Sequence, residues 1–227
     1  MFTIDNKPAH TNALLAALPE AEFRQLEPNL KLVTLDHGCM LSEQGSESCV
    51  YFPTSATVSI LYRLEDGGCP EIAVIGREGF VAGADFYGSH ARTYDAVVQH
   101  AGMGYRMQTQ QLQFALNHST TLMRSLMHCT NQLFNQMAQS IVSSRHQGIF
   151  EQVCRRLLLT LERVQSDSFR MTHENLAALL NTRRETVTAA AMQLASQGII
   201  KYTRGHITVL NRSRLEAQAG ECSPSFQ

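Results

Sequence analysis

The chain has 227 residues, 44% of them hydrophobic, and a formal net charge of −1. This composition supports a buried core, and it excludes both a disordered chain and binding to nucleic acid through bulk charge. No apolar run reaches the roughly 18 residues of a membrane-spanning helix. The N-terminus also lacks the basic and apolar regions of a secretory signal, so we expect a cytoplasmic protein. Six scattered cysteines without a CxxC pair are then expected to be reduced.

The charge differs between the two parts of the chain. Residues 1–147 carry nine Lys and Arg against 13 Asp and Glu, whereas residues 148–227 carry ten against seven. A mildly basic C-terminal part after an acidic N-terminal part agrees with a DNA-binding domain attached to a sensor. The difference is small and is only weak evidence by itself.

The N-terminal part predicts two short helices followed by a β-rich domain. The helices are expected over residues 12–18 and 20–26. Alternating apolar and polar residues predict strands over 30–35, 94–99 and 104–107. Two further strands, 58–62 and 71–75, flank the turn sequence Glu65-Asp66-Gly67-Gly68 and are expected to form a hairpin.

Residues 119–144 predict one long helix. Seven of its residues recur with the spacing of three and four that is typical of a coiled-coil seam: Met123, Leu126, Thr130, Leu133, Met137, Ser140 and Ser144. A second stripe, Leu122, Cys129, Phe134 and Ile141, would face elsewhere. A single amphipathic helix packed inside a monomer is the alternative. A further helix over 149–164 follows Gln147-Gly148, where we expect a hinge.

Residues 172–210 predict two short helices and a β-hairpin. Thr172 and Thr182 are expected to cap the helices, and Asn181 tolerates the positive φ of a sharp turn between them. Leu176, Leu179 and Leu180 give the first helix its buried stripe, and Val187, Ala190 and Leu194 give the second helix its own. Gly198 is expected to end the second helix. Strands over 199–202 and 207–210 then flank a tight turn at 203–206.

This layout is that of a helix-turn-helix followed by a wing, which places one helix in the major groove of DNA. Arg can donate two hydrogen bonds to guanine, and Glu can accept one from cytosine. An arginine pair on an ordinary helical hairpin is the alternative, which the turn and the wing disfavour. Side chains expected to face outward on the second helix are Arg183, Arg184, Glu185, Thr188 and Ala189. Residues expected to contact DNA are Thr172, Thr182, Arg183, Arg184, Glu185, Thr186, Thr188, Arg204 and His206.

Three motifs resemble the Crp/Fnr family of bacterial transcription regulators. The sequence RRETV after LAALLN resembles the recognition helix of that family. Leu35-x-x-Gly38-x-x-Leu41-x-x-x-Gly45 and the following Val50-Tyr51-Phe52 resemble the glycine-marked strands of a cyclic-nucleotide-binding-type β-roll. Residues 76–81, GREGFV, resemble a loop found in one branch of the family. The resemblance covers roughly residues 12 to 216.

The resemblance implies an α+β fold with an N-terminal antiparallel β-roll, a long dimerisation helix and a C-terminal winged helix-turn-helix. The expected limits are 1–117 for the sensor, 118–147 for the dimerisation helix, 148–216 for the DNA-binding domain and 217–227 for a flexible tail. It also implies a homodimer joined through residues 119–144, a palindromic double-stranded DNA site and RNA polymerase as a partner. Arg184 and Glu185 would read base edges, and Ala189 stands where the family often has another Arg.

The effector is less well defined. In the family, a Gly-Glu pair and, about ten residues on, an Arg-Ser/Thr pair hold a cyclic nucleotide. Arg92-Thr93 matches the phosphate-binding pair, but Ala82 stands where the ribose-binding Glu is expected. We therefore expect that cAMP does not bind. The alternatives are another anion, a larger nucleotide or an empty pocket. The candidate ligand residues are Gly79, Val81, Ala82, Gly83, Arg92 and Thr93.

Other inputs and activities have weaker support. No cysteine precedes Cys39, so the N-terminal ligands of an iron–sulfur sensor are missing. Haem ligation by His37, His90, His100 or His128, and a thiol switch at Cys39, Cys49 or Cys129, are less favoured than structural roles for these residues. We predict no catalytic or metal site, because HxH, HExxH, GxSxG and phosphate-loop motifs are missing. A nucleotide-binding module acting on a protein partner would leave the arginine face unexplained.

Overall fold

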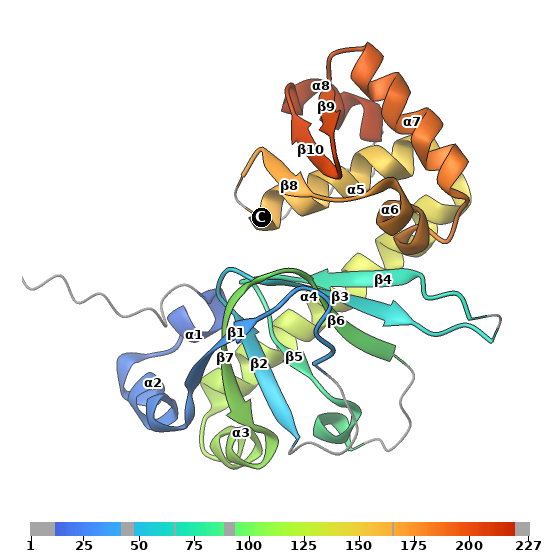
Figure 1. The fold of residues 1–227 in the computed structure, drawn as a ribbon. Coiled ribbons are helices and arrows are strands. Elements are labelled where there is room, and N and C mark those ends of the chain that lie inside the picture. Colours follow the sequence, from blue (N-terminus) through green and yellow to red (C-terminus); the bar gives the residue numbers. More distant parts are fainter. Residues whose placement is uncertain (1–11, 42–47, 66, 89–93, 165, 221–227) are drawn as a thin grey trace, which may run out of the picture. The chain divides into compact units, whose positions relative to one another are not determined.

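The computed structural model describes residues 12–41, 48–65, 67–88, 94–164 and 166–220. The chain divides into two compact units, one of residues 1–60 and 74–134, the other of residues 61–73 and 135–227. Antiparallel sheets in the N-terminal part, a long helix and a C-terminal helix-turn-helix confirm the predicted α+β fold (Figure 1). No helix in the described ranges is long and apolar enough to cross a membrane.

The N-terminal sheets have the expected antiparallel pairing. The first sheet has the order β1-β7-β2-β5 and the second the order β4-β3-β6. Lys31 pairs with Arg106 and Tyr51 also pairs with Arg106, which places β7 between β1 and β2. The strands are β1 (Lys31–Leu35), β2 (Cys49–Pro53), β3 (Thr57–Tyr62), β4 (Glu71–Ile75), β5 (Val81–Ala82), β6 (Tyr94–His100) and β7 (Gly102–Gln108). The flanking helices are α1 (Ala13–Ala16), α2 (Glu20–Leu26), η2 (Glu27–Asn29), η3 (Ala84–Tyr87) and α3 (Thr109–Leu116).

A buried asparagine joins α1 to the sheets. Asn12 caps α1 by accepting the Leu15 backbone N–H, and its side-chain amide donates to the carbonyls of Pro53 and Gly79. Because a buried amide is costly unless its donors and acceptor are satisfied, these three bonds fix the start of the fold to β2 and to the loop before β5. The adjoining core contains Phe52, Leu122 and other buried apolar side chains.

The long helix α4 (Thr120–His146) confirms the predicted helix, but the predicted seam along it is partly wrong. Leu126 is only 4% exposed and packs in the core beside Leu122, so it cannot lie on an open face. Phe134 and Ile141, predicted to face elsewhere, are 68% and 57% exposed. Spacing along a helix defines its stripes, but only the tertiary packing decides which stripe the sheet covers.

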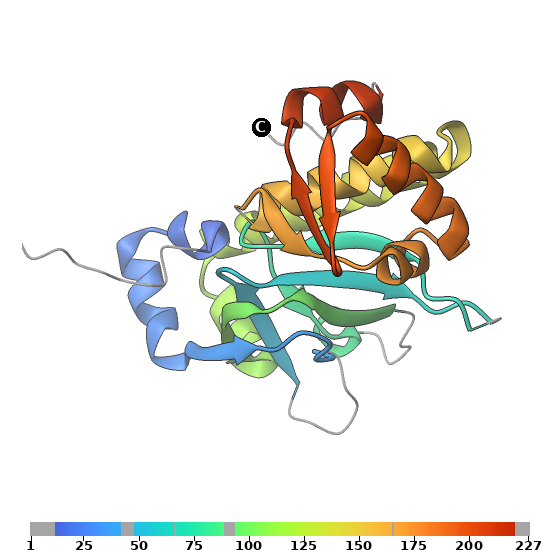
Figure 2. The same ribbon diagram turned by 45° about the horizontal axis from the view of Figure 1, so that its top comes forward.

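The C-terminal unit packs helices around a small sheet. Strands β8, β10 and β9 pair in that order, and β9 and β10 lie side by side as a hairpin (Figure 2). Its core includes Val153, Leu176, Val187 and Leu194, all fully buried. The elements are α5 (Ile149–Val164), β8 (Ser168–Arg170), α6 (His173–Leu179), α7 (Arg184–Ser196), β9 (Ile200–Thr203), β10 (His206–Val209) and α8 (Arg212–Ala219).

Helix α8 has no counterpart among the elements expected from the sequence. Asn211 caps it by accepting the Arg214 backbone N–H, and Leu215 and Ala219 are fully buried in the C-terminal core. The expectation of a flexible tail from residue 217 did not anticipate that residues 217–219 are helical. Residues 221–227 lie outside the described ranges.

Candidate nucleic-acid interface

The turn between α6 and α7 is fixed by local geometry. Thr172 caps α6 as predicted, because its hydroxyl accepts the Asn175 backbone N–H at 3.1 Å. Asn181 has a φ of 47°, as its residue type suggested. The next residue, Thr182, donates its backbone N–H to the Ala177 carbonyl at 2.9 Å. These contacts return the chain sharply, so that α7 packs against α6.

The predicted second cap is wrong. Thr182 lies in the turn, and Arg183 is the N-cap of α7, without a side-chain cap hydrogen bond. Arg184 and Glu185 therefore occupy the first two helical positions. Both are exposed, as are Arg183 and Thr186, whereas Val187 is fully buried. The helix dipole stabilises Glu185 in the first turn, and the two arginines are left to meet an external acceptor.

The hairpin of β9 and β10 has the geometry of a tight two-residue turn. Arg204 and Gly205 have φ angles of 47° and 82°, the positive values that a type I′ turn requires at both central positions. Thr203 and His206 form the last cross-strand pair before this turn. Arg204 and His206 are therefore exposed at the end of the hairpin, as predicted for a wing.

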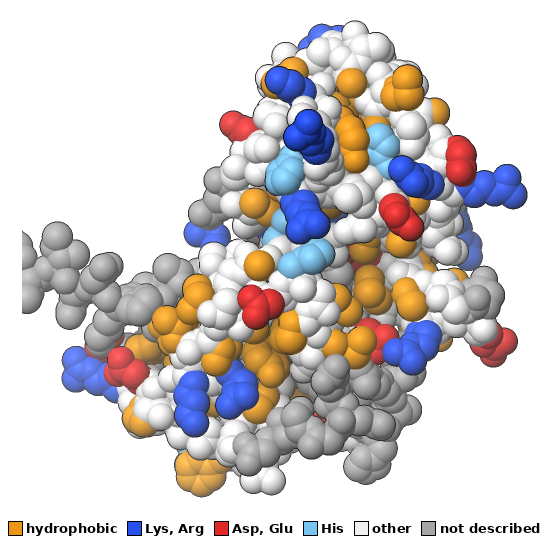
Figure 3. All heavy atoms as spheres, viewed as in Figure 1, with side chains coloured by type: hydrophobic (Ala, Val, Ile, Leu, Met, Phe, Trp, Pro, Cys, Tyr) orange, Lys and Arg blue, Asp and Glu red, His pale blue; other side chains and the backbone are white. Residues whose placement is uncertain are grey.

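Two further basic residues that the sequence did not single out lie on the same sheet. Arg170 of β8 pairs with His206 of β10, and Lys201 of β9 is exposed. Figure 3 shows that Lys, Arg and His side chains gather over this sheet in the C-terminal unit. The alternation of Phe169 and Met171, both buried, with Arg170 could have revealed β8 in the sequence.

His173 joins the three elements of this face. Its Nδ1 lies 3.0 Å from the Thr188 hydroxyl on α7, within hydrogen-bonding distance. Its ring stacks on Tyr202 of β9 with centroids 4.1 Å apart. Burial and the nearby Arg184 guanidinium lower the pKa of His173. A neutral His173 thus holds α6, α7 and the hairpin of β9 and β10 in one arrangement, a role that no local sequence signal indicates.

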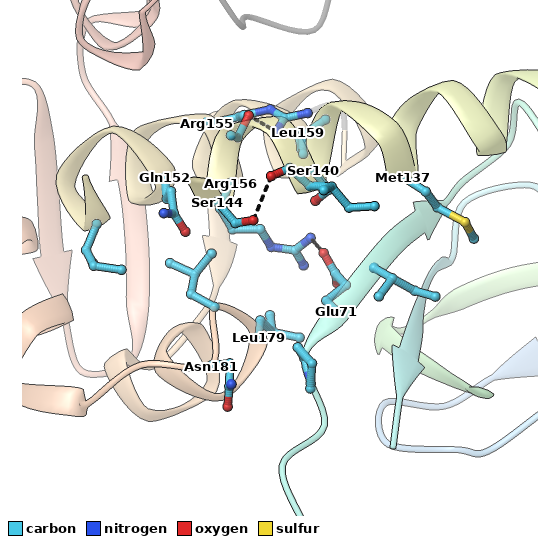
Figure 4. Close-up of a pocket in the computed structure, with 16 residues that line it drawn as sticks. Glu71, Met137, Ser140, Ser144, Gln152, Arg155, Arg156, Leu159, Leu179 and Asn181 are labelled. Carbon is cyan, nitrogen blue, oxygen red and sulfur yellow. Dashed lines mark hydrogen bonds and ion pairs between the residues drawn. The ribbon is translucent and has the colours of Figure 1, made fainter. Parts of the chain in front are cut away.

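A cavity of about 590 Å³ lies within the C-terminal unit (Figure 4). Residues 70–72, the C-terminal half of α4, α5 and the turn at Asn181 line it. Arg156 makes an ion pair with Glu71, and both side chains are buried. Arg155 donates to the Gln139 carbonyl at 3.1 Å and to Ser143.

The two buried arginines of this cavity have a structural role. Burial lowers the pKa of Arg156, and the charge of Glu71 opposes that shift. Removing one partner of such a pair leaves a buried charge without compensation. Arg155 and Arg156 of α5 are therefore tied to the fold, whereas the exposed arginines of α7 and the wing, with Arg170 and Lys201, are open to a ligand.

The candidate effector residues lie around β5, as far as the structure describes them. Val81 and Ala82 pair with β2, Ala82 is 5% exposed within the apolar core, and its carbonyl accepts the Tyr94 hydroxyl at 3.1 Å. Gly79 is buried and Gly83 is half-buried. Arg92 and Thr93, expected to bind a phosphate, lie outside the described residues, as does His90. The Glu78 carboxylate accepts the Gly76 backbone N–H at 3.0 Å, within its own loop.

The cysteines differ in their environment. Cys39 is exposed, whereas burial, with a contribution from Glu78, raises the pKa of Cys129 to about 11. Burial raises the pKa of Cys154 to about 12. Since the thiolate is the reactive form, these shifts disfavour oxidation at Cys129 and Cys154. Within the described ranges, no group of three or more His, Cys, Asp or Glu is arranged to hold a metal ion.

Comparison with known proteins agrees with this geometry. The sequence family described as the Crp-like helix-turn-helix domain matches residues 151–218. No curated protein sequence matches the chain significantly.

Several solved structures have the same fold over most of the chain. One from Eubacterium rectale, of the Crp/Fnr family, superposes with a TM-score of 0.72 at 15% identity, covering 92% of this chain and 99% of that one. FixK2 from Bradyrhizobium japonicum gives 0.68 at 18% identity, covering 83% and 96%. A CRP-family regulator from Thermus thermophilus gives 0.71 at 14% identity, covering 86% and 100%.

The charge state of His173 predicts a pH dependence of stability. Because its folded pKa is lowered, the unfolded chain binds more protons as the pH falls below the unfolded value of about 6.5. The stability that neutral His173 contributes is present above that pH and is lost on acidification. His173→Phe, which keeps an aromatic ring on Tyr202 but does not titrate, is therefore expected to lose less stability between about pH 7.5 and about pH 5.5. Urea unfolding of both proteins at the two pH values measures this, and equal losses would contradict it.

Proposed function

We propose that the chain is a member of the Crp/Fnr family that binds a palindromic DNA site as a homodimer and regulates transcription. The match of residues 151–218 to the Crp-like helix-turn-helix domain and the fold shared with Crp/Fnr structures support this proposal. The observation that carries this proposal is the exposed pair Arg184 and Glu185 at the start of α7, beside a wing that ends in Arg204. RNA polymerase is the proposed partner at the promoter, and the cytoplasm is the proposed site of action.

Two kinds of DNA contact follow from this geometry. Arg184 and Glu185 lie at the N-terminal end of the recognition helix, the end that contacts base edges in this class of domain. Six further residues are proposed to position the helix, mainly through phosphate contacts: Thr172, Thr182, Arg183, Thr186, Thr188 and His206. Arg204 lies at the wing tip, beyond the end of its strand, and is proposed to contact phosphate.

The dimer is proposed to form along the exposed stripe of α4. Met123, Met127, Phe134 and Ile141 fall within about 40° of one another on a helix of 3.6 residues per turn. All four side chains are exposed, between 39% and 68%. An apolar stripe with this four-and-seven spacing is the seam that two parallel helices would bury. A two-fold dimer also places two recognition helices about 34 Å apart, as a palindrome requires.

The β-roll effector is proposed to be something other than cAMP, either another anion or a larger nucleotide. Ala82, at the expected position of the ribose-binding Glu, packs in the apolar core and offers no acceptor side chain. A thiol-responsive regulator with a vestigial pocket is the second candidate. Exposed Cys39 supports it, and the raised pKa of Cys129 opposes it. A nucleotide-binding module acting on a protein partner is a third candidate, and it gives the exposed arginine face no role.

Base reading and phosphate binding are separated by two substitutions. Arg184→Ala is expected to cost about 1–3 kcal/mol on a selected palindromic site and to flatten the preference at one base. Arg204→Ala is expected to weaken binding to all sequences and to reduce the salt slope by about one. Affinities on specific and random duplexes across a salt series measure both. Equal loss on the two duplexes for Arg184→Ala would remove it from base reading, and an unchanged slope would remove Arg204 from phosphate contact.

The proposed seam predicts the effect of a charge on its centre. Phe134→Glu should weaken the dimer at least about 100-fold, because two buried rings are lost and two carboxylates meet. Gln139→Glu adds the same charge on the opposite side of α4 and should leave the dimer intact. Light scattering of folded protein during size-exclusion chromatography gives the mass of each. A Phe134→Glu protein that stays dimeric would place the interface elsewhere.

The missing ribose acceptor predicts that cAMP leaves DNA affinity unchanged at fixed salt. The same titration with a panel of other cyclic mononucleotides and dinucleotides shows whether any of them acts on the protein. Tighter specific binding in cAMP would contradict the proposal, because it requires a ribose contact that Ala82 cannot make. Indifference to every nucleotide would favour the thiol-responsive candidate, which reduction and oxidation of the same sample would then test.

A further inference from the structure

The outer face of α7 continues past its charged start as an apolar surface. Arg184, Glu185, Thr188, Ala189 and Met192 line a shallow hollow of about 340 Å³. Met192 is 66% exposed, although its long side chain is apolar, and Ala189 beside it is exposed as well. Ala191 and Leu194, which lie on either side of Met192 in the sequence, are both buried, so this part of α7 is packed on the core. The exposure of Met192 is therefore not a consequence of fraying at the helix end.

The position of this surface on α7 indicates that a DNA base, and not a protein partner, covers it. Ala189 lies five residues after Arg184, and a helix rises about 1.5 Å per residue, so the two are separated by about 7.5 Å along the axis. Base pairs are stacked about 3.4 Å apart. Met192 lies eight residues after Arg184, or about 12 Å along the axis. Bases about two to four steps from the one that Arg184 contacts therefore lie beside Ala189 and Met192. A protein partner on the same surface would have to cover the exposed charges of Arg184 and Glu185, which share the hollow.

The chemistry of the hollow narrows the choice among bases. In the major groove, thymine alone presents a methyl group, and small apolar side chains contact it favourably. Ala189 and Met192 can offer neither a donor nor an acceptor of ordinary strength to the edges of guanine, cytosine or adenine. An apolar surface over one of those edges would leave base polar groups without water or a partner, which costs free energy.

We propose that Ala189 and Met192 recognise the C5-methyl group of a thymine, about two to four base pairs from the base that Arg184 contacts. This inference rests on the proposed DNA-binding function and deepens it. Thymine at that position is specified by burial of its methyl group, and Arg184 and Glu185 are left to read the polar edges of the neighbouring base pairs. The neighbouring Thr188, which also lines the hollow, is held by its contact with His173.

The test uses the full chain and DNA in which single methyl groups are removed. A palindromic site is first selected from random duplexes. Each thymine of the half-site is then replaced in turn by deoxyuridine, which keeps every hydrogen-bonding group. One replacement near the Arg184 contact is expected to weaken binding about fourfold per half-site, the equivalent of one buried methyl group. Replacement of the other thymines should change little.

A substitution in the protein assigns the effect to the hollow. Met192→Gln keeps the length of the side chain and a good helix former, and it should bring the ratio of thymine to deoxyuridine affinity close to one. Gln193→Ala, at an exposed neighbour that does not line the hollow, should keep the fourfold ratio. The measurement on the unchanged chain stands even if Met192→Gln folds poorly.

Two outcomes overturn the inference alone. Specific binding that is indifferent to every deoxyuridine replacement removes methyl recognition, and a ratio retained in folded Met192→Gln removes its assignment to this surface. Failure of the full chain to select any sequence overturns the DNA-binding proposal, and the inference falls with it. A position-specific fourfold loss that disappears in Met192→Gln supports both.

Discussion

The crossing of α6 and α7 is the constraint on which the candidate interface depends. Leu176 and Val187 are fully buried where the two helices meet, and Ala177 lets their backbones approach closely. Asn181 makes the crossing sharp by adopting a positive φ. With these four residues in place, Arg184 and Glu185 can only point away from the core. The buried contacts between α6 and α7 therefore decide which side chains α7 exposes.

A second constraint aligns the face with the wing. The backbone holds the hairpin of β9 and β10, because β10 also pairs with β8 and the Gly205 carbonyl in the wing turn accepts the Met171 backbone N–H at 2.8 Å. His173 adds a side-chain link between the wing and α7, because it is hydrogen-bonded to Thr188 and stacked on Tyr202. DNA reading requires that the recognition helix and the wing meet the same duplex, so one side chain that contacts both is a direct way to fix their relation.

In the N-terminal unit, the packing of helices on the sheets is well defined, whereas the effector of the candidate ligand site is not identified. Asn12 and the core around Phe52 tie the helices firmly to the sheets. Around β5, however, the side chain at position 82 is an apolar core residue, and the Ala82 carbonyl is bonded to Tyr94. Position 82 therefore contributes packing instead of the polar contact that the resemblance led us to expect, which is the basis of our proposal that cAMP does not bind here.

Elements that depend on local geometry and periodic burial could be predicted from the amino-acid order alone. Asn181, Gly198 and the Arg204-Gly205 turn require positive φ, and all four residues have it. The spacing of apolar residues likewise predicted α5, α6 and α7.

Only the tertiary structure decided which contacts form between residues far apart in the chain. It placed Leu126 in the core and Phe134 on the open face, paired Arg156 with Glu71, and stacked His173 on Tyr202. A helical stripe is visible in one segment, but its partner belongs to another segment, and the free energy that selects between stripes comes from the area they bury together.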